Sequence, residues 1–275
     1  MSLSICSFSS GSSGNSYLIK NGKDAILVDA GISAARILRE LARTGTARED
    51  VRALFITHEH WDHTVGARVL LKKLPQAQVF ASEGTMAALC GQRAGYRLSF
   101  DADVAPARRK IIAPEQPVRV GNLTVRAFRT LHDAAEPLGF SVESGGKSIA
   151  IVTDTGAVTE EILFAAGDAD VLVLESNHDV DILRNGSYPW PLKQRILSEH
   201  GHLSNAQAAR ALCRVFADNP KKRVVLLAHL SAENNTPRVA EQTVCALLAQ
   251  EGWFTGSSLY VGVLLRDTAS LLFTL

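Results

Sequence analysis

The segment Thr57-His58-Glu59-His60-Trp61-Asp62-His63 directly follows an apolar run, residues 51–56, that predicts a buried strand. The segment holds four potential metal ligands within six residues, namely His58, His60, Asp62 and His63. An exposed polar loop is the alternative, but charged and imidazole groups clustered this tightly repel groups of their own kind or stay unpaired unless something holds them. Because a divalent cation does so, the segment predicts a metal site.

Three further apolar runs each end in a residue that can bind a metal, namely His132, Asp154 and His229. A single histidine at a strand end is usually a surface residue or one with a hydrogen-bond partner, so each case alone is weak. Together they place ligand atoms at the same edge of the predicted sheets.

Strand patterns alternate with helical ones along the chain. Residues 3–29 predict a three-stranded meander, in which Asn21-Gly22 indicates a type I′ hairpin turn. A helix is predicted around residues 64–74, and residues 271–275 are predicted to close the chain as a strand. The alternation predicts an α/β fold with two mixed β-sheets packed face to face and helices outside. No repeat or low-complexity linker divides the chain, so we expect a single domain over residues 1–275.

The composition excludes a strong overall attraction to nucleic acid or membranes. The formal net charge is +1 and the pI is about 7.8, so any site for a polyanion must be local. The cysteines Cys6, Cys90, Cys213 and Cys245 form no CxxC motif, which favours reduced cysteines in a cytoplasmic protein. No apolar run approaches the length of a membrane span, and the first residues do not resemble a signal peptide. We therefore expect a soluble protein without a membrane partner.

The metal motifs resemble those of a known family. The strings HEHWDH at 58–63, LHD at 131–133, TDTG at 153–156 and LAHLS at 227–231 match, in this order, the motifs of the metallo-β-lactamase-fold hydrolases, as does LVDAG at 27–31. A finer resemblance, to the YycJ (WalJ)-like subgroup, spans nearly the whole chain. It rests on SGSSGN at 10–15, HDAAEP at 132–137, ESNHD at 175–179, YPWPLKQRILS at 188–198, GHLSN at 201–205 and LAHLSAENNTP at 227–237.

This resemblance implies an αββα sandwich with two divalent ions at one edge. One ion is expected to take His58, His60 and His132. The other is expected to take Asp62, His63 and His229, with Asp154 as the bridge between them. Asp29, the acid of LVDAG, is expected to orient a ligand imidazole. Imidazole and carboxylate ligands accept Zn²⁺, Mn²⁺ or Fe²⁺.

The resemblance also implies an activity. Members of the subgroup act as nucleases, which implies a 5′-to-3′ exonuclease on double-stranded DNA that uses a metal-bridging hydroxide as nucleophile. The metal ligands cannot select the substrate, because thioesters and lactones are also hydrolysed on such centres within this superfamily. A small-molecule thioester or lactone hydrolase is therefore the alternative. Oligomeric state is not predicted.

His202 is the candidate that favours a phosphodiester. It stands just before a helix start, because Ser204 and Gln207 form a capping-box pair. This segment resembles the histidine-bearing segment of tRNase Z-type phosphodiesterases, where a histidine partnered by a glutamate helps to expel the leaving oxygen. Glu175 is the matching partner, and the candidate catalytic residues are Asp62, His202 and Glu175. A capping or packing histidine is the alternative for His202.

The glycine- and serine-rich segment Ser10–Asn15 joins two strands of the meander. Glycines let the main chain approach a ligand, and successive N–H groups can bind an anion. The helix start after Ser204 can also bind phosphate. The candidate substrate-binding residues are thus Ser12, Ser13, Asn15 and Ser204, whereas a tight turn without a ligand is the alternative for the segment.

Trp190 has two interpretations. It could pack its helix against the body of the protein or stack on an unpaired base, and we favour packing. His178 and His200 receive no assigned role.

Overall fold

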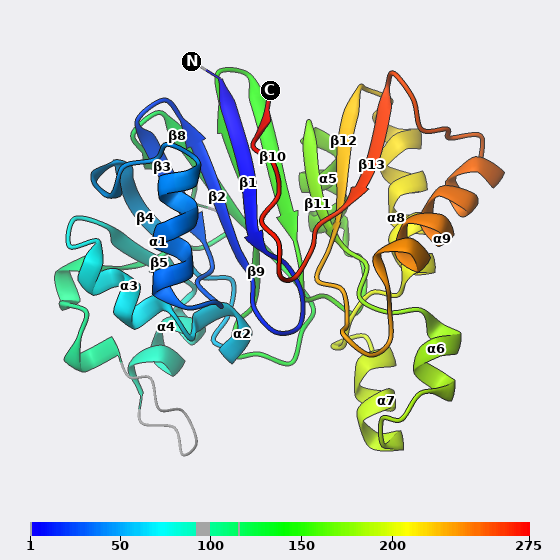
Figure 1. The fold of residues 1–275 in the computed structure, drawn as a ribbon, viewed down its shortest axis with the longest axis horizontal. Coiled ribbons are helices and arrows are strands. Elements are labelled where there is room, and N and C mark those ends of the chain that lie inside the picture. The colour runs from blue at the N-terminus through cyan, green and yellow to red at the C-terminus, as the bar shows by residue number, and fades with distance from the viewer. Residues whose placement is uncertain (1, 92–99, 115) are drawn as a thin grey trace.

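Two seven-stranded β-sheets pack face to face in the computed structural model, which describes residues 2–91, 100–114 and 116–275 (Figure 1). The first sheet contains β1 (Leu3–Ser9), β2 (Ser16–Asn21), β3 (Asp24–Val28), β4 (Val51–Phe55), β5 (Gln78–Ala81), β6 (Arg109–Ile111) and β14 (Phe273–Thr274). The second contains β7 (Val118–Val120), β8 (Leu123–Arg129), β9 (Leu138–Ser144), β10 (Lys147–Val152), β11 (Val171–Glu175), β12 (Arg223–Ala228) and β13 (Leu259–Val263). The strand orders are β14–β1–β2–β3–β4–β5–β6 and β13–β12–β11–β10–β9–β8–β7.

The first sheet joins an antiparallel meander, β1 to β3, to a parallel half, β3 to β6. Side chains alternate along β1, so that Leu3 and Ile5 face the other sheet while Cys6 and Phe8 pack under helices. The outer face of this sheet is covered by α1 (Ala34–Arg43), α3 (Ala67–Lys73) and α4 (Glu83–Cys90).

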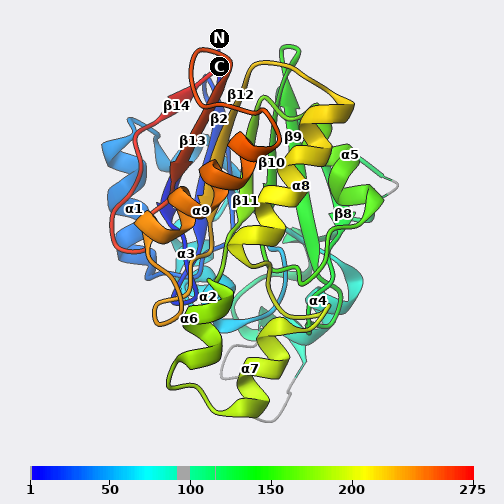
Figure 2. The ribbon, with the colours of Figure 1, turned by 90° about the vertical axis from the view of Figure 1, so that its right-hand side faces the viewer.

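The second sheet also joins an antiparallel half to a parallel half. Strands β7 to β10 are antiparallel, and β10 to β13 are parallel. Its outer face is covered by α5 (Glu160–Asp168), α8 (Asn205–Asp218) and α9 (Pro237–Gln250), as Figure 2 shows. Between the sheets, Phe55 stacks on Phe80 with ring centroids 4.7 Å apart, and Phe140 packs edge-on against Phe55. Burying one such side chain contributes roughly 1.5–3 kcal/mol. The predicted αββα sandwich is confirmed.

The strands that precede the ligand residues end at one edge of the sandwich, the lower edge in Figure 1. The short helices α2 (Trp61–Thr64), α6 (Val180–Asn185) and α7 (Trp190–Leu197) also lie there. Just past three strand ends the chain adopts positive φ, at Asp29 (60°), Asp154 (57°) and His229 (55°). Such angles are uncommon outside glycine and cost about 1–3 kcal/mol each. The strained backbone therefore coincides with the predicted metal edge.

The hairpin between β2 and β3 forms as predicted, but its turn is not type I′. Asn21 pairs with Asp24, and of the two residues between them only Gly22 has a positive φ, 64°. Type I′ requires positive φ at both central residues. The strand predicted over residues 271–275 is reduced to β14, because only Phe273 and Thr274 pair with β1.

The helix predicted around residues 64–74 is divided into α2 and α3. The division falls at Gly66, whose N–H donates to the Ala30 carbonyl over 2.8 Å. A Cβ at Gly66 would lie 2.0 Å from the Ile32 carbonyl oxygen, so the main chain passes too close for any other residue. The spacing of apolar residues in the sequence could not reveal this main-chain contact. The same spacing did not predict α6.

All four cysteines are free, as predicted. Among the residues that the structure describes, none of the helices has the length and apolar character needed to cross a bilayer.

Candidate metal centre

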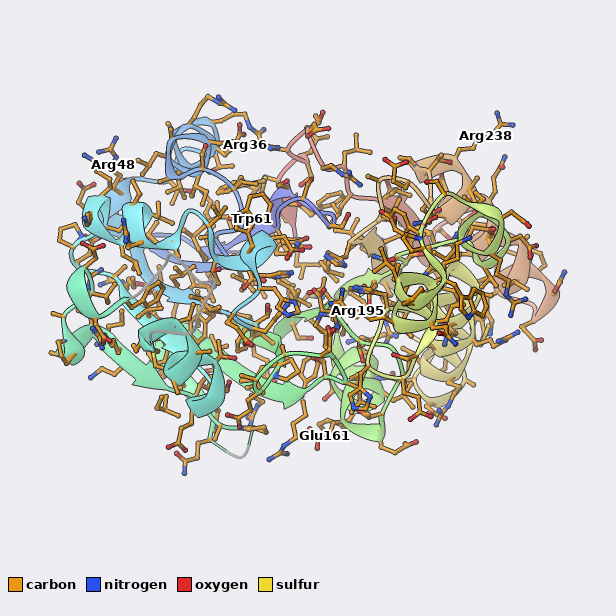
Figure 3. The ribbon with its side chains drawn as sticks, turned by 90° about the horizontal axis from the view of Figure 1, so that it is seen from below. Arg36, Arg48, Trp61, Glu161, Arg195 and Arg238 are labelled. Carbon is orange, nitrogen blue, oxygen red and sulfur yellow. The ribbon has the colours of Figure 1, made fainter. Side chains whose placement is uncertain are left out.

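Seven side chains from four separate segments meet at the lower edge of the sandwich, which Figure 3 views face on. The ligand atoms form four overlapping groups, in each of which they lie within 4.8 Å of one another. Two of them, called the two ligand groups here, are His58, His60 and His132, and Asp62, His63 and His229. The other two are His58, His63 and Asp154, and Asp154, Glu175, His202 and His229. Asp154 lies between the two ligand groups, because its Oδ2 is 3.2 Å from His63 Nε2 and its Oδ1 is 3.8 Å from His132 Nε2. The structure thus brings together the residues predicted as ligands, while their division between two ions stays a prediction.

Four of the five ligand imidazoles are oriented by contacts on the side away from the centre, whereas His60 Nδ1 contacts His132 Nε2 over 3.3 Å. His63 Nδ1 donates to Asp29 Oδ2 over 2.7 Å, which is the geometry expected of Asp29. An outer partner of this kind fixes the tautomer and turns the other ring nitrogen inward. The remaining outer partners are Thr57 Oγ1 for His58 (3.0 Å), the Gly201 carbonyl for His132 (3.1 Å) and Glu175 Oε1 for His229 (3.0 Å).

The donor set fits divalent metals. Among the described residues, His58 Nε2 and Asp154 Oδ2 are buried and make no hydrogen bond of acceptable geometry, although Asp154 Oδ2 lies 3.2 Å from His63 Nε2. A buried polar atom without a partner costs roughly 1–3 kcal/mol, and native proteins rarely leave one so. A divalent cation would satisfy both atoms, and imidazole with carboxylate suits Zn²⁺, Mn²⁺ and Fe²⁺.

The charges within the cluster support the same conclusion. Burial alone would raise the pKa of Asp154, but the charges of His229 and His63 outweigh it and hold this pKa well below its usual range. Burial likewise opposes charge on His229, yet the carboxylate of Asp154 raises its pKa to about 10. Carboxylates and imidazolium groups therefore neutralise one another here, and a metal would replace the imidazolium protons.

His202 and Glu175 form the pair that the sequence suggested. His202 Nδ1 donates to Glu175 Oε1 over 2.7 Å, and the Glu175 carboxyl also accepts from the main-chain N–H groups of Thr155 and Leu203. Burial would raise the pKa of Glu175, but the charges of His202 and His229 lower it to about 2. The carboxyl is thus an anion that holds both imidazoles.

The His202 ring lies over the centre. Its centroid is 4.9 Å from that of His132 and 5.3 Å from that of His229, and its side chain is 16% exposed. A substrate at the metals could therefore reach the ring nitrogen that does not contact Glu175.

The glycine- and serine-rich loop lies at this edge. Ser10 Oγ accepts from the His229 main-chain N–H over 2.9 Å, and the Asn15 N–H donates to the Asp62 carbonyl over 2.8 Å. Ser12 and Ser13, at the tip of the loop, are exposed. The tip of the loop is therefore open to a ligand. The two ends of the loop, at Ser10 and Asn15, contact the main chain of the metal-binding segments.

Two predicted substrate-binding residues are buried supports instead. The Asn15 amide contacts Gly11 and lies 3.2 Å from His63 Nε2. Ser204 forms the capping box with Gln207, and its hydroxyl is occupied there. Neither side chain faces solvent, so we reassign both from substrate contact to support of the site.

Three residues without an assigned role, Trp190, His200 and His178, differ in solvent exposure. Trp190 is 60% exposed at the start of α7, so the packing interpretation is wrong. His200 is exposed. His178 is buried, and burial lowers its pKa to about 4; neither of its ring nitrogens has a hydrogen-bond partner among the described residues. It is therefore a neutral imidazole.

Sequence reasoning missed two supports of the ligands, Thr57 and Gly201. The Thr57 hydroxyl contacts Asp29 as well as His58 and His63. Its place directly before the ligand segment was the available signal. The Gly201 contact uses a main-chain carbonyl, for which a sequence gives no signal.

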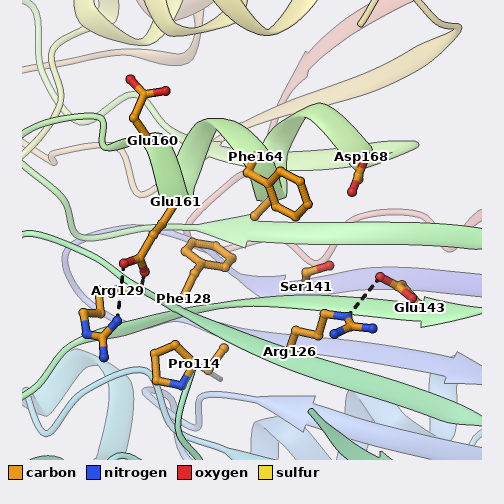
Figure 4. A pocket seen from close by; sticks show the side chains of 12 residues that line it. Pro114, Arg126, Phe128, Arg129, Ser141, Glu143, Glu160, Glu161, Phe164 and Asp168 are labelled. Carbon is orange, nitrogen blue, oxygen red and sulfur yellow. Dashed lines mark hydrogen bonds and ion pairs between the residues drawn. The ribbon is translucent and has the colours of Figure 1, made fainter. Parts of the chain in front are cut away.

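A groove of about 740 Å³ lies away from the centre, between α5 and strands β8 and β9 (Figure 4). Both arginines that line it pair with glutamates of the same groove, Arg126 with Glu143 and Arg129 with Glu161. No histidine lines it. None of the groups of candidate metal ligands among the described residues lies in it, so we do not assign the active site to it.

Comparison with known proteins agrees with this geometry. Residues 24–229 match the family model of the beta-lactamase superfamily domain. The chain is 38% identical over 261 residues to "Exodeoxyribonuclease WalJ" of Streptococcus pneumoniae, covering 95% of this chain and 94% of that protein. It is 35% identical over 262 residues to "Exodeoxyribonuclease YycJ" of Bacillus anthracis, covering 94% of each.

A solved structure supports the fold alone. The metallo-beta-lactamase fold protein YhfI of Bacillus subtilis superposes with a TM-score of 0.70 at 16% identity, covering 98% of this chain and 99% of that one. The matched family model and the two relatives show that the chain belongs to the β-lactamase superfamily, in the family of the WalJ and YycJ exodeoxyribonucleases.

Proposed function

We propose that this protein is a metal-dependent exodeoxyribonuclease that removes nucleotides from double-stranded DNA in the 5′-to-3′ direction. The observation that carries the proposal is the His202–Glu175 pair beside a complete set of metal ligands, in a chain whose relatives are named exodeoxyribonucleases. The four free cysteines suit a reducing compartment, so we place the enzyme in the cytoplasm.

The ligand set would hold two divalent ions, with Asp154 as the shared ligand. When bound, such ions lower the pKa of water, so that hydroxide is available near neutral pH, and they stabilise charge on the phosphate oxygens. The two carboxylates Asp62 and Asp154 offset only part of the ionic charge. The ions themselves would therefore still attract the oxygens of an anionic substrate.

His202 is assigned as the general acid. Its Nδ1 donates to Glu175, which leaves Nε2 to give a proton to the leaving oxygen of the DNA strand. The buried Glu175 carboxylate accepts from Nδ1 and thereby fixes the tautomer and orientation of the ring. Glu175 also holds His229, so a single carboxylate links the proton donor to the metal ligands.

The exposed tip of the loop, Ser12 and Ser13, is assigned to substrate phosphate. Gly11 and Gly14 flank the tip, and the Gly14 N–H donates to the Gly11 carbonyl over 2.9 Å, which closes a turn. Main-chain N–H groups and two hydroxyls at such a tip can hydrogen-bond an anion.

The proposal is tested with purified protein and end-labelled duplex DNA in Mn²⁺ or Zn²⁺, beside a thioester and a lactone panel. We expect mononucleotide release that a chelator abolishes. Release of the 5′ label before the 3′ label would support the direction. Hydrolysis of a thioester or lactone with intact DNA would instead identify a small-molecule hydrolase.

A further inference from the structure

The metal edge carries a guanidinium that the sequence patterns did not single out. Arg195 of α7 donates through Nε and Nη2 to the carboxylate of Asp133, the residue directly after the ligand His132. Asp133 Oδ1 in turn lies 3.3 Å from His132 Nε2. Arg195 is thus two short contacts from a ligand nitrogen, and Figure 3 shows it near the middle of this face.

The main chain around Arg195 is fixed relative to the centre. The connector between α7 and α8, residues 198–204, folds back so closely that a Cβ on Gly201 would lie 2.3 Å from the Arg195 carbonyl oxygen. The same connector provides the Gly201 carbonyl that orients His132 and the imidazole of His202. The guanidinium, a metal ligand and the proposed general acid are therefore held by one short segment.

Arg195 retains donors for a ligand. A guanidinium has five N–H groups, and Asp133 takes one on Nε and one on Nη2. Within the described residues Nη1 makes no hydrogen bond, and the side chain is 51% exposed. The hydrogen bond to Asp133 raises the pKa of Arg195, and the charge of Asp62 adds to this effect. The cation is therefore within electrostatic reach of both ligand groups.

Stability of the fold does not explain this arrangement. An ion pair with both partners partly exposed stabilises a protein by at most about 1 kcal/mol. The contact with Asp133 fixes the orientation of the Arg195 guanidinium. A guanidinium that is held on one side presents its other N–H groups in a fixed direction.

We propose that Arg195 binds the DNA phosphate next to the scissile one and that Asp133 positions it to do so. The inference rests on the proposed function. The metals would face the scissile phosphate, so a neighbouring phosphate needs a partner of its own. A guanidinium binds phosphate oxygens through two parallel hydrogen bonds. Arg195 would then favour a polynucleotide over a diester that carries only one phosphate.

The test compares Arg195→Gln with the wild type on duplex DNA and on bis(p-nitrophenyl) phosphate. We expect the KM for DNA to rise about tenfold or more, the scale of one charge-assisted hydrogen bond, with kcat within about twofold. The ratio of kcat/KM for DNA to that for the small diester should fall by a similar factor. The salt dependence of log KM should lose about 0.7–0.9 of slope.

The matched control is Arg238→Gln, because Arg238 is an exposed arginine at the periphery of the face shown in Figure 3. A second arm uses DNA with an uncharged methylphosphonate at single positions beside the scissile bond. At the contacted position the wild type and Arg195→Gln should become equivalent.

Two results would overturn the inference. One is an Arg195→Gln enzyme that matches the wild type on fully charged DNA. The other is an equal loss on the small diester, accompanied by lower metal content and reproduced by Asp133→Asn, which would make the pair a support of His132. If the wild type itself does not degrade DNA, the proposed function fails and the inference fails with it.

Discussion

Replacing His202 by alanine should separate proton transfer from metal binding. Glu175 accepts from four groups, and this variant removes only the contact with His202 at 2.7 Å. The buried carboxylate keeps Thr155, Leu203 and His229 as donors, so the ligand His229 stays oriented. We therefore expect unchanged metal content but a fall in kcat on DNA of about a hundredfold to ten-thousandfold, the usual contribution of a general acid.

Glu175→Gln should behave differently. Glu175 Oε1 accepts from both His202 and His229, at 2.7 and 3.0 Å, and an amide oxygen lacks the charge that stabilises two imidazoles. The variant should lose rate as His202→Ala does, and it should also bind metal about 10–100-fold more weakly, the usual effect of losing the outer partner of a ligand.

The assay is single-turnover digestion of duplex DNA beside hydrolysis of bis(p-nitrophenyl) phosphate, with metal content measured by elemental analysis. p-Nitrophenolate leaves without a proton, so His202→Ala should keep most of its activity on that substrate. Full activity of His202→Ala on DNA, or an equal loss on both substrates, would refute the assignment of His202 as the acid.

Three further outcomes follow from the geometry. Asp154→Ala should reduce metal occupancy at both positions, from about two ions per chain, because its carboxylate oxygens face both ligand groups; full occupancy would contradict the bridging role. Ser12→Ala combined with Ser13→Ala should raise the KM for DNA without changing the melting temperature or metal content, since both side chains are exposed; an unchanged KM would leave the loop as a plain turn. Gly31→Ala should lower the free energy of unfolding by about 1–3 kcal/mol or more, because its Cβ would lie 1.6 Å from a main-chain carbonyl oxygen. Chemical denaturation measures this, with Gly167→Ala as the control, because a Cβ there meets nothing within 4 Å. Gly167 lies in α5, so the control should be as stable as the wild type or up to about 1 kcal/mol more stable.

The sequence predicted the parts of the site that depend on local order. His58, His60, Asp62 and His63 follow one strand within six residues, and a strand end fixes the edge at which such side chains lie. The partnership of His202 with Glu175 was predicted from a resemblance, and the structure places the two in contact.

Contacts made by the main chain or by distant segments were beyond sequence reasoning. Asn15 was predicted to bind substrate, but the close approach of Gly14 to the Gly31 carbonyl turns the base of the loop inward and buries it. Arg195 stands 62 residues from Asp133, so only the folded chain reveals the pair. The break at Gly66 has the same origin, because it depends on the backbone of a neighbouring loop.

The central claim is that the metal centre degrades DNA from an end. The most direct measurement compares a linear duplex with a covalently closed circle of the same sequence, each incubated with the Mn²⁺-loaded wild type and with Asp154→Ala. We predict that the wild type reduces the linear DNA to mononucleotides, that the circle stays intact, and that Asp154→Ala and chelated wild type leave both intact. Cutting of the circle, or a linear duplex that survives the metal-loaded wild type, would contradict the proposed exonuclease.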